Sequence, residues 1–223
     1  AEVEKIVMEA KAKGVKRVCM GAAYRNPNSS ALKRVAEYIS LIKKHDMESC
    51  ATLGSLTQAQ ADELKAAGLD YYNHNIDTSP EFYPQVITTR TFQDRVDTIT
   101  NVGNAGIKVC CGGILGLGES REDRISFIHA LTKLPYTPDS IPINLLVKVA
   151  GTKLANAPDV DKLEFIRVIA TVRILFPQTR IRLSAGRLGL SEMAQTICFM
   201  SGAKSIHFGE KLLTTENTAK NSD

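Results

Sequence analysis

The sequence predicts an α/β fold, a (β/α)8 TIM-type barrel whose first strand is missing from this chain. Short apolar runs alternate with amphipathic helical segments about every thirty residues, the length of one strand and its crossover helix. The apolar runs are nearly continuous, as in strands of a parallel sheet that helices cover on both faces. With 223 residues, the chain is long enough for one such barrel.

Seven segments have helical periodicity, and several end at a residue that stops a helix. Gly14, Gly68 and Gly106 follow helices as C-caps, Pro177 stops another helix, and Thr57 is an expected N-cap. The expected helices cover residues 3–13, 31–45, 58–67, 91–104, 121–133, 160–176 and 191–200.

Seven strands are expected between and after these helices. They cover residues 17–22, 49–54, 70–81, 107–115, 141–149, 180–185 and 205–208. Because the chain opens in a helix and without Met, we expect the first strand of the barrel to lie upstream. The predicted barrel domain covers residues 1–216, and residues 217–223 form a polar tail that we expect to be frayed.

The composition excludes several classes of protein. The net charge is +4 and no basic block stands out, so no nucleic acid is expected as a partner. No apolar run would span a bilayer and no signal peptide opens the chain, so no membrane partner is expected. Five widely spaced cysteines do not resemble a disulfide framework, which indicates a reducing compartment. We expect a cytoplasmic protein of bacterial type, although an organelle is not excluded.

The stretch from residue 70 to 81 carries an unusual row of polar side chains. As a strand, it would place Tyr71, Asn73, Asn75 and Asp77 on one face. Amides and carboxylates are costly to bury without partners, so such a row favours a ligand site. The alternative is a turn-rich loop, because Asn and Asp also favour turns.

Cysteines lie in three of the predicted strands. Cys19, Cys50 and Cys110 could converge inside the barrel on a thiophilic metal or an iron–sulfur cluster. Buried cysteines are also ordinary core residues, and this alternative stays open at the level of spacing. Cys111, on the opposite face from Cys110, and Cys198, in a helix, are better explained by packing.

Two further features lie at predicted strand ends. Gly112 and Gly113 would let a ligand approach the backbone, or they could mark a bulge. Lys148 shares a strand face with Asn144 and could form a Schiff base if it were desolvated. A lysine at the barrel mouth that reaches water or binds an anion is the alternative.

Several segments resemble the biotin synthase family of radical S-adenosylmethionine enzymes. The resemblance covers nearly the whole chain, in order, through the segments RVCMGAA, ESCATLG, GLDYYNHNIDTSPEFY, TTRTFQDR, IKVCCGGILGLGES, PINLLVKV, RIRLSAGR and KLLTT. It implies sulfur insertion into dethiobiotin to form biotin, the last step of biotin biosynthesis. A 4Fe–4S cluster cleaves S-adenosylmethionine to a radical in this family, and a 2Fe–2S cluster supplies the sulfur.

The resemblance also implies the site residues. The ligands of the 2Fe–2S cluster match Cys19, Cys50, Cys110 and Arg182. The S-adenosylmethionine site matches Asn75, Asp77, Arg95, Gly112 and Gly113. The dethiobiotin site matches Asn73, Asn75, Asn144, Thr214 and Thr215. A flavodoxin or ferredoxin system as electron donor and a homodimer are further implied.

One motif of the family is absent from this chain. The Cys-x-x-x-Cys-x-x-Cys motif, which holds the 4Fe–4S cluster, does not occur in the sequence. The chain alone is therefore expected to be inactive, and truncation is the simplest explanation. Two alternatives stay open: a non-catalytic barrel that retains the substrate pocket, and an aldolase that forms a Schiff base on Lys148.

Overall fold

The computed structural model describes residues 2–207, 211–212 and 215–216. The contacts between residues divide the chain into two compact units. Unit 1 comprises Ala1–His74 and Gln93–Cys110, and unit 2 comprises Asn75–Phe92 and Cys111–Asp223. Each unit therefore combines two separate stretches of the sequence.

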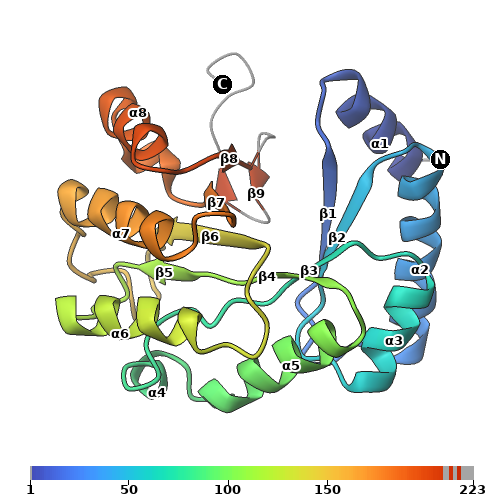
Figure 1. Cartoon of the computed structure of the whole chain (residues 1–223), viewed down its shortest axis with the longest axis horizontal. Coiled ribbons are helices and arrows are strands. Elements are labelled where there is room, and N and C mark those ends of the chain that lie inside the picture. The colour runs from blue at the N-terminus through green and yellow to red at the C-terminus, as the bar shows by residue number, and fades with distance from the viewer. Residues whose placement is uncertain (1, 208–210, 213–214, 217–223) are drawn as a thin grey trace. The chain divides into compact units, whose positions relative to one another are not determined.

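Unit 1 alternates helices with four parallel strands. The strands β1 (Arg17–Gly21), β2 (Glu48–Thr52), β3 (Tyr71–Asn73) and β4 (Lys108–Cys110) lie side by side in chain order. They follow the helices α1 (Glu2–Ala12), α2 (Ser29–Lys44), α3 (Gln58–Ala66) and α5 (Phe92–Asn104). Figure 1 shows α1, α2 and α3 along one side of β1 and β2.

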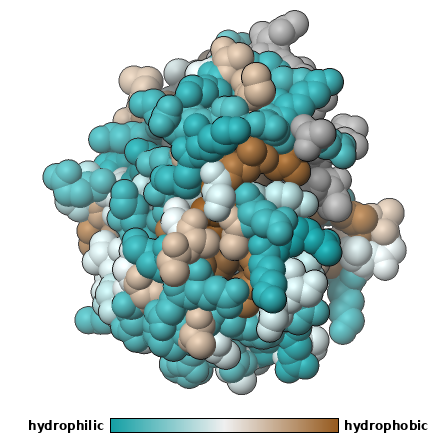
Figure 2. All heavy atoms as spheres, turned by 90° about the vertical axis from the view of Figure 1, so that its right-hand side faces the viewer, coloured by the Kyte–Doolittle hydropathy of each residue, from teal (hydrophilic) through white to brown (hydrophobic). Residues whose placement is uncertain are grey.

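The helices of unit 1 begin where side chains can satisfy their first N–H groups. Thr57 caps α3, as the sequence predicts, and the structure adds a capping box of Thr57 with Gln60 and a cap of α2 by Asn28. Ile39 and Ile42 of α2 are fully buried, whereas the opposite face of this helix is charged. Figure 2 faces the side of the molecule where α2 lies, and this face is mostly hydrophilic.

Unit 2 contains a second set of parallel strands. The strands β5 (Gly113–Leu115), β6 (Ser140–Leu145), β7 (Arg180–Leu183) and β8 (Ser205–Ile206) pair in chain order. The helices α6 (Arg121–Thr132), α7 (Lys162–Leu175) and α8 (Glu192–Met200) lie between them in the sequence and stack in order in space (Figure 1). Fully buried Ile141, Ile143, Phe165 and Ile169 form part of the core of this unit.

The expected alternation of helices and parallel strands is confirmed, but several predicted strands are shorter than expected or divided, and three of them matter for the site. The stretch 70–81 is a strand only over β3, and Asp77 adopts a left-handed conformation with φ of 66°. The run 107–115 divides into β4 and β5 because the chain leaves the strand at Cys111 and Gly112. The strand expected at 141–149 ends at Leu145, so Lys148 lies beyond it.

Some short elements were not expected from the sequence. They are the helical turns α4 (Tyr83–Val86) and η1 (Arg187–Gly189) and the antiparallel pair of β9 (Lys211–Leu212) and β10 (Thr215–Glu216). Phe208 and the predicted tail 217–223 lie outside the described residues. No helix in the described part of the chain combines the length and apolarity needed to cross a membrane.

Candidate functional site

Three cysteines share one face of the strands in unit 1. Cys19 on β1 is the register partner of Cys50 on β2, and Cys110 on β4 is the partner of Asn73 on β3. Cys50 is in turn the partner of Tyr71, two residues before Asn73, so all three thiols project to the same side of the strands. Cys50 and Cys110 are buried, and Cys19 is exposed. None of the chain's cysteines forms a disulfide.

The three thiols are close enough to affect one another. Cys50 shares a hydrogen bond with the thiol of Cys19, and this bond is the largest cause of a pKa well above the ordinary value for Cys50. Burial and the neighbouring Cys19 and Cys110 raise the pKa of Cys50 further, and only the positive charge of Arg17 acts in the opposite direction. A metal that binds here must therefore displace protons from these thiols.

The chemistry of this donor set fits an iron–sulfur cluster. Thiolates are the usual protein ligands of such clusters. Among the described residues, no three His, Cys, Asp or Glu side chains form a site for a single metal ion. We call Cys19, Cys50 and Cys110 the cysteine layer, and it is a candidate cluster site because its three thiols share one strand face and lie close to one another.

The other two cysteines pack in the interior. Cys111 and Cys198 are both fully buried. Burial raises the pKa of the Cys198 thiol to about 11. These features agree with the packing role that the sequence predicts for both residues.

Two further predicted residues lie in unit 1. Asn73 follows Tyr72 at the end of β3, and its Nδ2 donates a hydrogen bond to Oγ1 of Thr52 at 3.2 Å. Arg95 lies half-buried in the first turn of α5. Asn73 thus lies at the carboxyl end of its strand, where ligands of parallel α/β folds bind.

In unit 2, the segment from Asn75 to Asp77 runs along the start of β5. The side chain of Asn75 accepts a hydrogen bond from the N–H of Gly112 at 3.1 Å. The backbone of Asp77 donates to the carbonyl of Gly112 and accepts from the N–H of Ile114. The left-handed turn at Asp77 thus ends the polar row of the sequence, while Nδ2 of Asn75 has no partner in the described part of the chain.

Gly112 and Gly113 are glycines because other parts of the protein occupy the space of a side chain. A Cβ on Gly112 would lie 1.9 Å from the carbonyl oxygen of Pro142. A Cβ on Gly113 would lie 2.5 Å from the carbonyl oxygen of Asp77. The close approach that the sequence suggests is therefore made first by the protein's own backbone.

Asn144 on β6 holds two neighbouring segments with one amide. Its Nδ2 donates to the carbonyl of Gly113 at 2.9 Å, and its Oδ1 accepts from the N–H of Ala185 at 3.0 Å. An amide has two N–H groups and two lone pairs on its oxygen, so one donor and one acceptor position are left for a ligand.

A buried ion pair that sequence reasoning missed closes the loop after β5. Both carboxylate oxygens of Glu119 accept from the N–H of Gly116 at 3.0 Å, and Arg124 donates to Oε1 at 2.8 Å. The Glu119 side chain is 2% exposed. Hydrophobic periodicity does not mark this pair in the sequence; the chain turns at Gly116, which has φ of 97°, three residues before Glu119.

The remaining predicted residues are placed as follows. Arg182 lies half-buried on β7, and its Nε is buried without a hydrogen-bond partner among the described residues. A buried unpaired donor of this kind is costly and fits a residue that contacts a bound group. Thr215 begins β10, and Thr214 lies outside the described residues.

Lys148 does not have the surroundings of a Schiff-base lysine. Its Nζ lies 2.9 Å from Oδ1 of Asp159, and its side chain is 31% exposed. A Schiff-base lysine sits in a desolvated pocket, whereas this side chain is partly exposed and paired with a carboxylate. The structure therefore favours the alternative given above, in which Lys148 reaches water at the surface.

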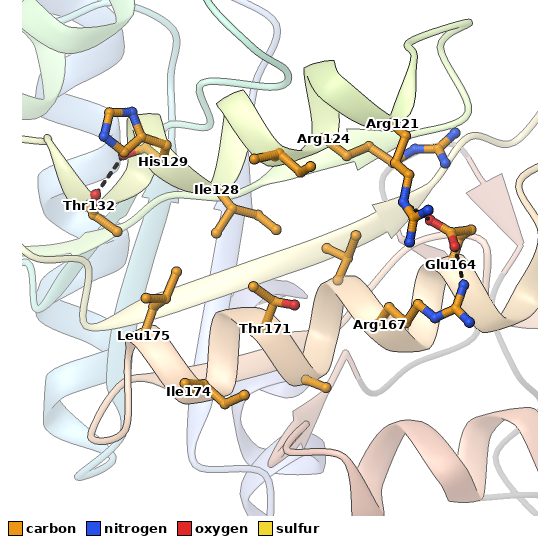
Figure 3. A pocket seen from close by; sticks show the side chains of 13 residues that line it. Arg121, Arg124, Ile128, His129, Thr132, Glu164, Arg167, Thr171, Ile174 and Leu175 are labelled. Atoms are coloured by element: carbon orange, nitrogen blue, oxygen red, sulfur yellow. Dashed lines mark hydrogen bonds and ion pairs between the residues drawn. The ribbon is translucent and has the colours of Figure 1, made fainter.

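An apolar groove of about 510 Å³ runs between α6 and α7. Figure 3 shows Ile128, Thr171 and Leu175 between the two helices, with Glu164 at one end beside Arg121 and Arg167. The groove brings together none of the residues that the sequence predicts for the site.

Two family models match the chain. Residues 1–131 match the Radical SAM superfamily, and residues 142–223 match the Biotin and Thiamin Synthesis associated domain. Together these matches cover all of the residues that the sequence predicts for the site.

Curated relatives match the whole length of the chain. A biotin synthase from Hahella chejuensis is 54% identical over 225 residues, which cover 100% of this chain and 64% of the relative. A biotin synthase from Coxiella burnetii is 56% identical over 214 residues, which cover 96% of this chain and 67% of the relative. The chain thus spans about two thirds of the length of these relatives.

Solved structures show the same fold at low sequence identity. Methylornithine synthase matches with a TM-score of 0.79 at 20% identity, over 92% of this chain and 60% of that one. A FeFe-hydrogenase maturase from Carboxydothermus hydrogenoformans matches with a TM-score of 0.75 at 22% identity, over 92% of this chain and 50% of that one. The predicted TIM-type class is therefore confirmed.

Proposed function

Because the chain belongs to the Radical SAM superfamily and, within it, to the biotin synthase family, we propose that its complete protein converts dethiobiotin to biotin. The reaction would be a radical sulfur insertion that uses S-adenosylmethionine, and the protein would be a sulfurtransferase. The single observation that carries this proposal is the cysteine layer, where three thiols from separate strands share one face of unit 1.

The residues of this chain have distinct roles in the proposal. Cys19, Cys50, Cys110 and Arg182 would hold the 2Fe–2S cluster, whereas this chain contains no Cys-x-x-x-Cys-x-x-Cys set for the 4Fe–4S cluster. When bound, these clusters supply the sulfur atom and the electron that the reaction needs. The unpaired, buried Nε of Arg182 supports its assignment to the 2Fe–2S site.

The polar residues of the site would bind and orient the organic ligands. Asn75, Asp77, Arg95, Gly112 and Gly113 would bind S-adenosylmethionine, with Arg95 opposite the carboxylate of its methionine part. Asn73, Asn75, Asn144, Thr214 and Thr215 would bind dethiobiotin.

Asn144 is well suited to the ureido ring of dethiobiotin. Its bonds to Gly113 and Ala185 fix the amide plane, while the remaining N–H and lone pair match a ring that both donates and accepts. The unpartnered Nδ2 of Asn75 would add a second donor. Fixed amides of this kind contribute to the reaction by positioning the substrate.

The partners of the protein belong to the same proposal. They are an electron-donating flavodoxin or ferredoxin system and a second copy of the chain in a homodimer. Both come from membership of the family. A cytoplasmic location is supported by the bacterial origin of the relatives.

The test is biotin formation by the natural full-length protein. The protein is reconstituted anaerobically with iron and sulfide and supplied with dethiobiotin, S-adenosylmethionine and reduced flavodoxin. We expect biotin from the natural protein and at least a tenfold loss of kcat/KM in Asn144→Ala, the loss of about 1.4 kcal/mol that one ligand hydrogen bond contributes. The matched control is Asn104→Ala, which removes an exposed amide of α5. A protein that binds dethiobiotin but forms no biotin would be a non-catalytic binding barrel instead.

A further inference from the structure

Arg17 is a buried cation beside the cysteine layer. Its side chain is 8% exposed. The guanidinium stacks on the ring of Tyr71, with Cζ 3.2 Å from the ring centroid. Nε and Nη2 lie 3.0 and 2.9 Å from Oε2 of Glu48, its register partner on β2. These contacts hold the charged group in one place.

The guanidinium has more donors than its neighbours use. Nη1 and Nη2 are buried, and neither nitrogen donates a hydrogen bond within the described residues, although Nη2 forms the ion pair with Glu48. A guanidinium carries five N–H groups, and buried donors without acceptors are costly. Such a group is expected where a further anionic acceptor binds.

The position of Arg17 on β1 directs it to the cysteine layer. Arg17 and Cys19 are two residues apart and therefore share a strand face, as do their partners Glu48 and Cys50. The guanidinium also stacks on Tyr71, the register partner of Cys50 on β3, so it lies beside this thiol on the same face of the strands. The cation therefore lies within electrostatic reach of the site.

We propose that Arg17 is a positioning residue of the cysteine layer, whose fixed charge and spare N–H groups stabilise the anionic iron–sulfur group held there and raise its reduction potential. This inference rests on the proposed function. Reduction adds one electron to the cluster, so a nearby positive charge favours the reduced state more than the oxidised state. Net charge and hydrogen bonds to sulfur are known determinants of cluster potential.

The test is a redox titration of the reconstituted chain with dithionite as the one-electron donor, followed by the optical spectrum. At the midpoint potential of the natural chain, we expect the ratio of reduced to oxidised cluster to be about tenfold lower in Arg17→Gln than in the natural chain. This change corresponds to a shift of the midpoint potential by about 59 mV to lower values. Glu48→Gln removes the compensating anion and should shift the midpoint in the opposite direction. Lys16→Gln removes an equal charge from an exposed neighbour and should leave the midpoint unchanged.

The outcomes separate this inference from the proposed function. If Arg17 served only to join β1 to β2, Arg17→Gln and Glu48→Gln would both lose iron, and neither would shift the midpoint potential in the stated direction. This result would overturn the inference. If Arg17→Gln retains no cluster, the redox titration of Glu48→Gln tests the inference instead. A raised midpoint potential in Glu48→Gln supports the inference, and an unchanged midpoint potential overturns it. A natural chain that binds no iron overturns the 2Fe–2S assignment and, with it, the role of Arg17.

Discussion

Cys50 on β2 shares a hydrogen bond with Cys19, its register partner on β1. This relationship follows from parallel pairing, which places partner side chains on the same face of the sheet. The pairing of β2 with β3 and of β3 with β4 then adds Cys110 to the same face. The convergence of three cysteines that the sequence left open is thus a consequence of strand register within one unit.

Gly112→Ala should destabilise the protein through a steric clash. The new Cβ would lie 1.9 Å from the carbonyl oxygen of Pro142, so the backbone must move. We expect a loss of about 3 kcal/mol in the free energy of unfolding, measured with urea. Gly189→Ala is the control, because a Cβ there meets nothing within 4 Å. Equal stabilities of the two variants would contradict this explanation.

Glu119→Gln should weaken the loop after β5. The change leaves the Arg124 cation without its buried partner, and breaking a buried pair typically costs about 3 kcal/mol. The double variant Glu119→Gln/Arg124→Gln should recover part of this loss in urea unfolding. A double variant no more stable than the single one would show that Glu119 acts mainly through Gly116.

Asp70 should make stability depend on pH in the acid range. Burial opposes its negative charge, but the hydrogen bonds from Ser49 and the ion pair with Lys43 outweigh burial and hold the pKa of Asp70 below its ordinary value. A carboxyl group with a lowered pKa stabilises the fold above about pH 4, its pKa in the unfolded chain, and this contribution is lost as pH falls through the folded-state value.

Asp70→Asn should therefore lower stability at pH 7 by about 1–2 kcal/mol and flatten the loss of stability below pH 4. Urea unfolding at several pH values measures both effects. The control Asp62→Asn, an exposed position on α3, should change stability at pH 7 by less than about 0.5 kcal/mol. If the stability of Asp70→Asn fell as steeply below pH 4 as that of the natural chain, Asp70 would not be the cause of the acid dependence.

The alternation of elements was predictable because it depends on local patterns. Thr57 caps α3 as expected, and the glycines after α1, α3 and α5 lie in the left-handed conformation that a C-cap favours. The length of the polar strand was not predictable, because the left-handed turn at Asp77 depends on bonds to Gly112 and Ile114. An alternating sequence pattern predicts a strand, but it cannot show where hydrogen bonds from other segments replace the regular bonding between strands.

The candidate site was predictable only in part. The resemblance to a family supplied the residues, whereas spacing alone could not separate cysteine ligands from buried core cysteines. Arg17 and Glu119 have no signal in hydrophobic periodicity, because their importance lies in burial and in their partners. The amide of Asn144 proved to be fixed by Gly113 and Ala185, which strand assignment alone does not indicate.

The iron and sulfide content after anaerobic reconstitution tests the central claim most directly. The account predicts about two irons per chain, as in a 2Fe–2S cluster, and their loss in Cys50→Ala. Cys198→Ala is the matched control, since it removes another fully buried thiol and should retain the iron. Equal iron content in Cys50→Ala and the natural chain, or a folded natural chain that binds no iron, would contradict the assignment of the cysteine layer.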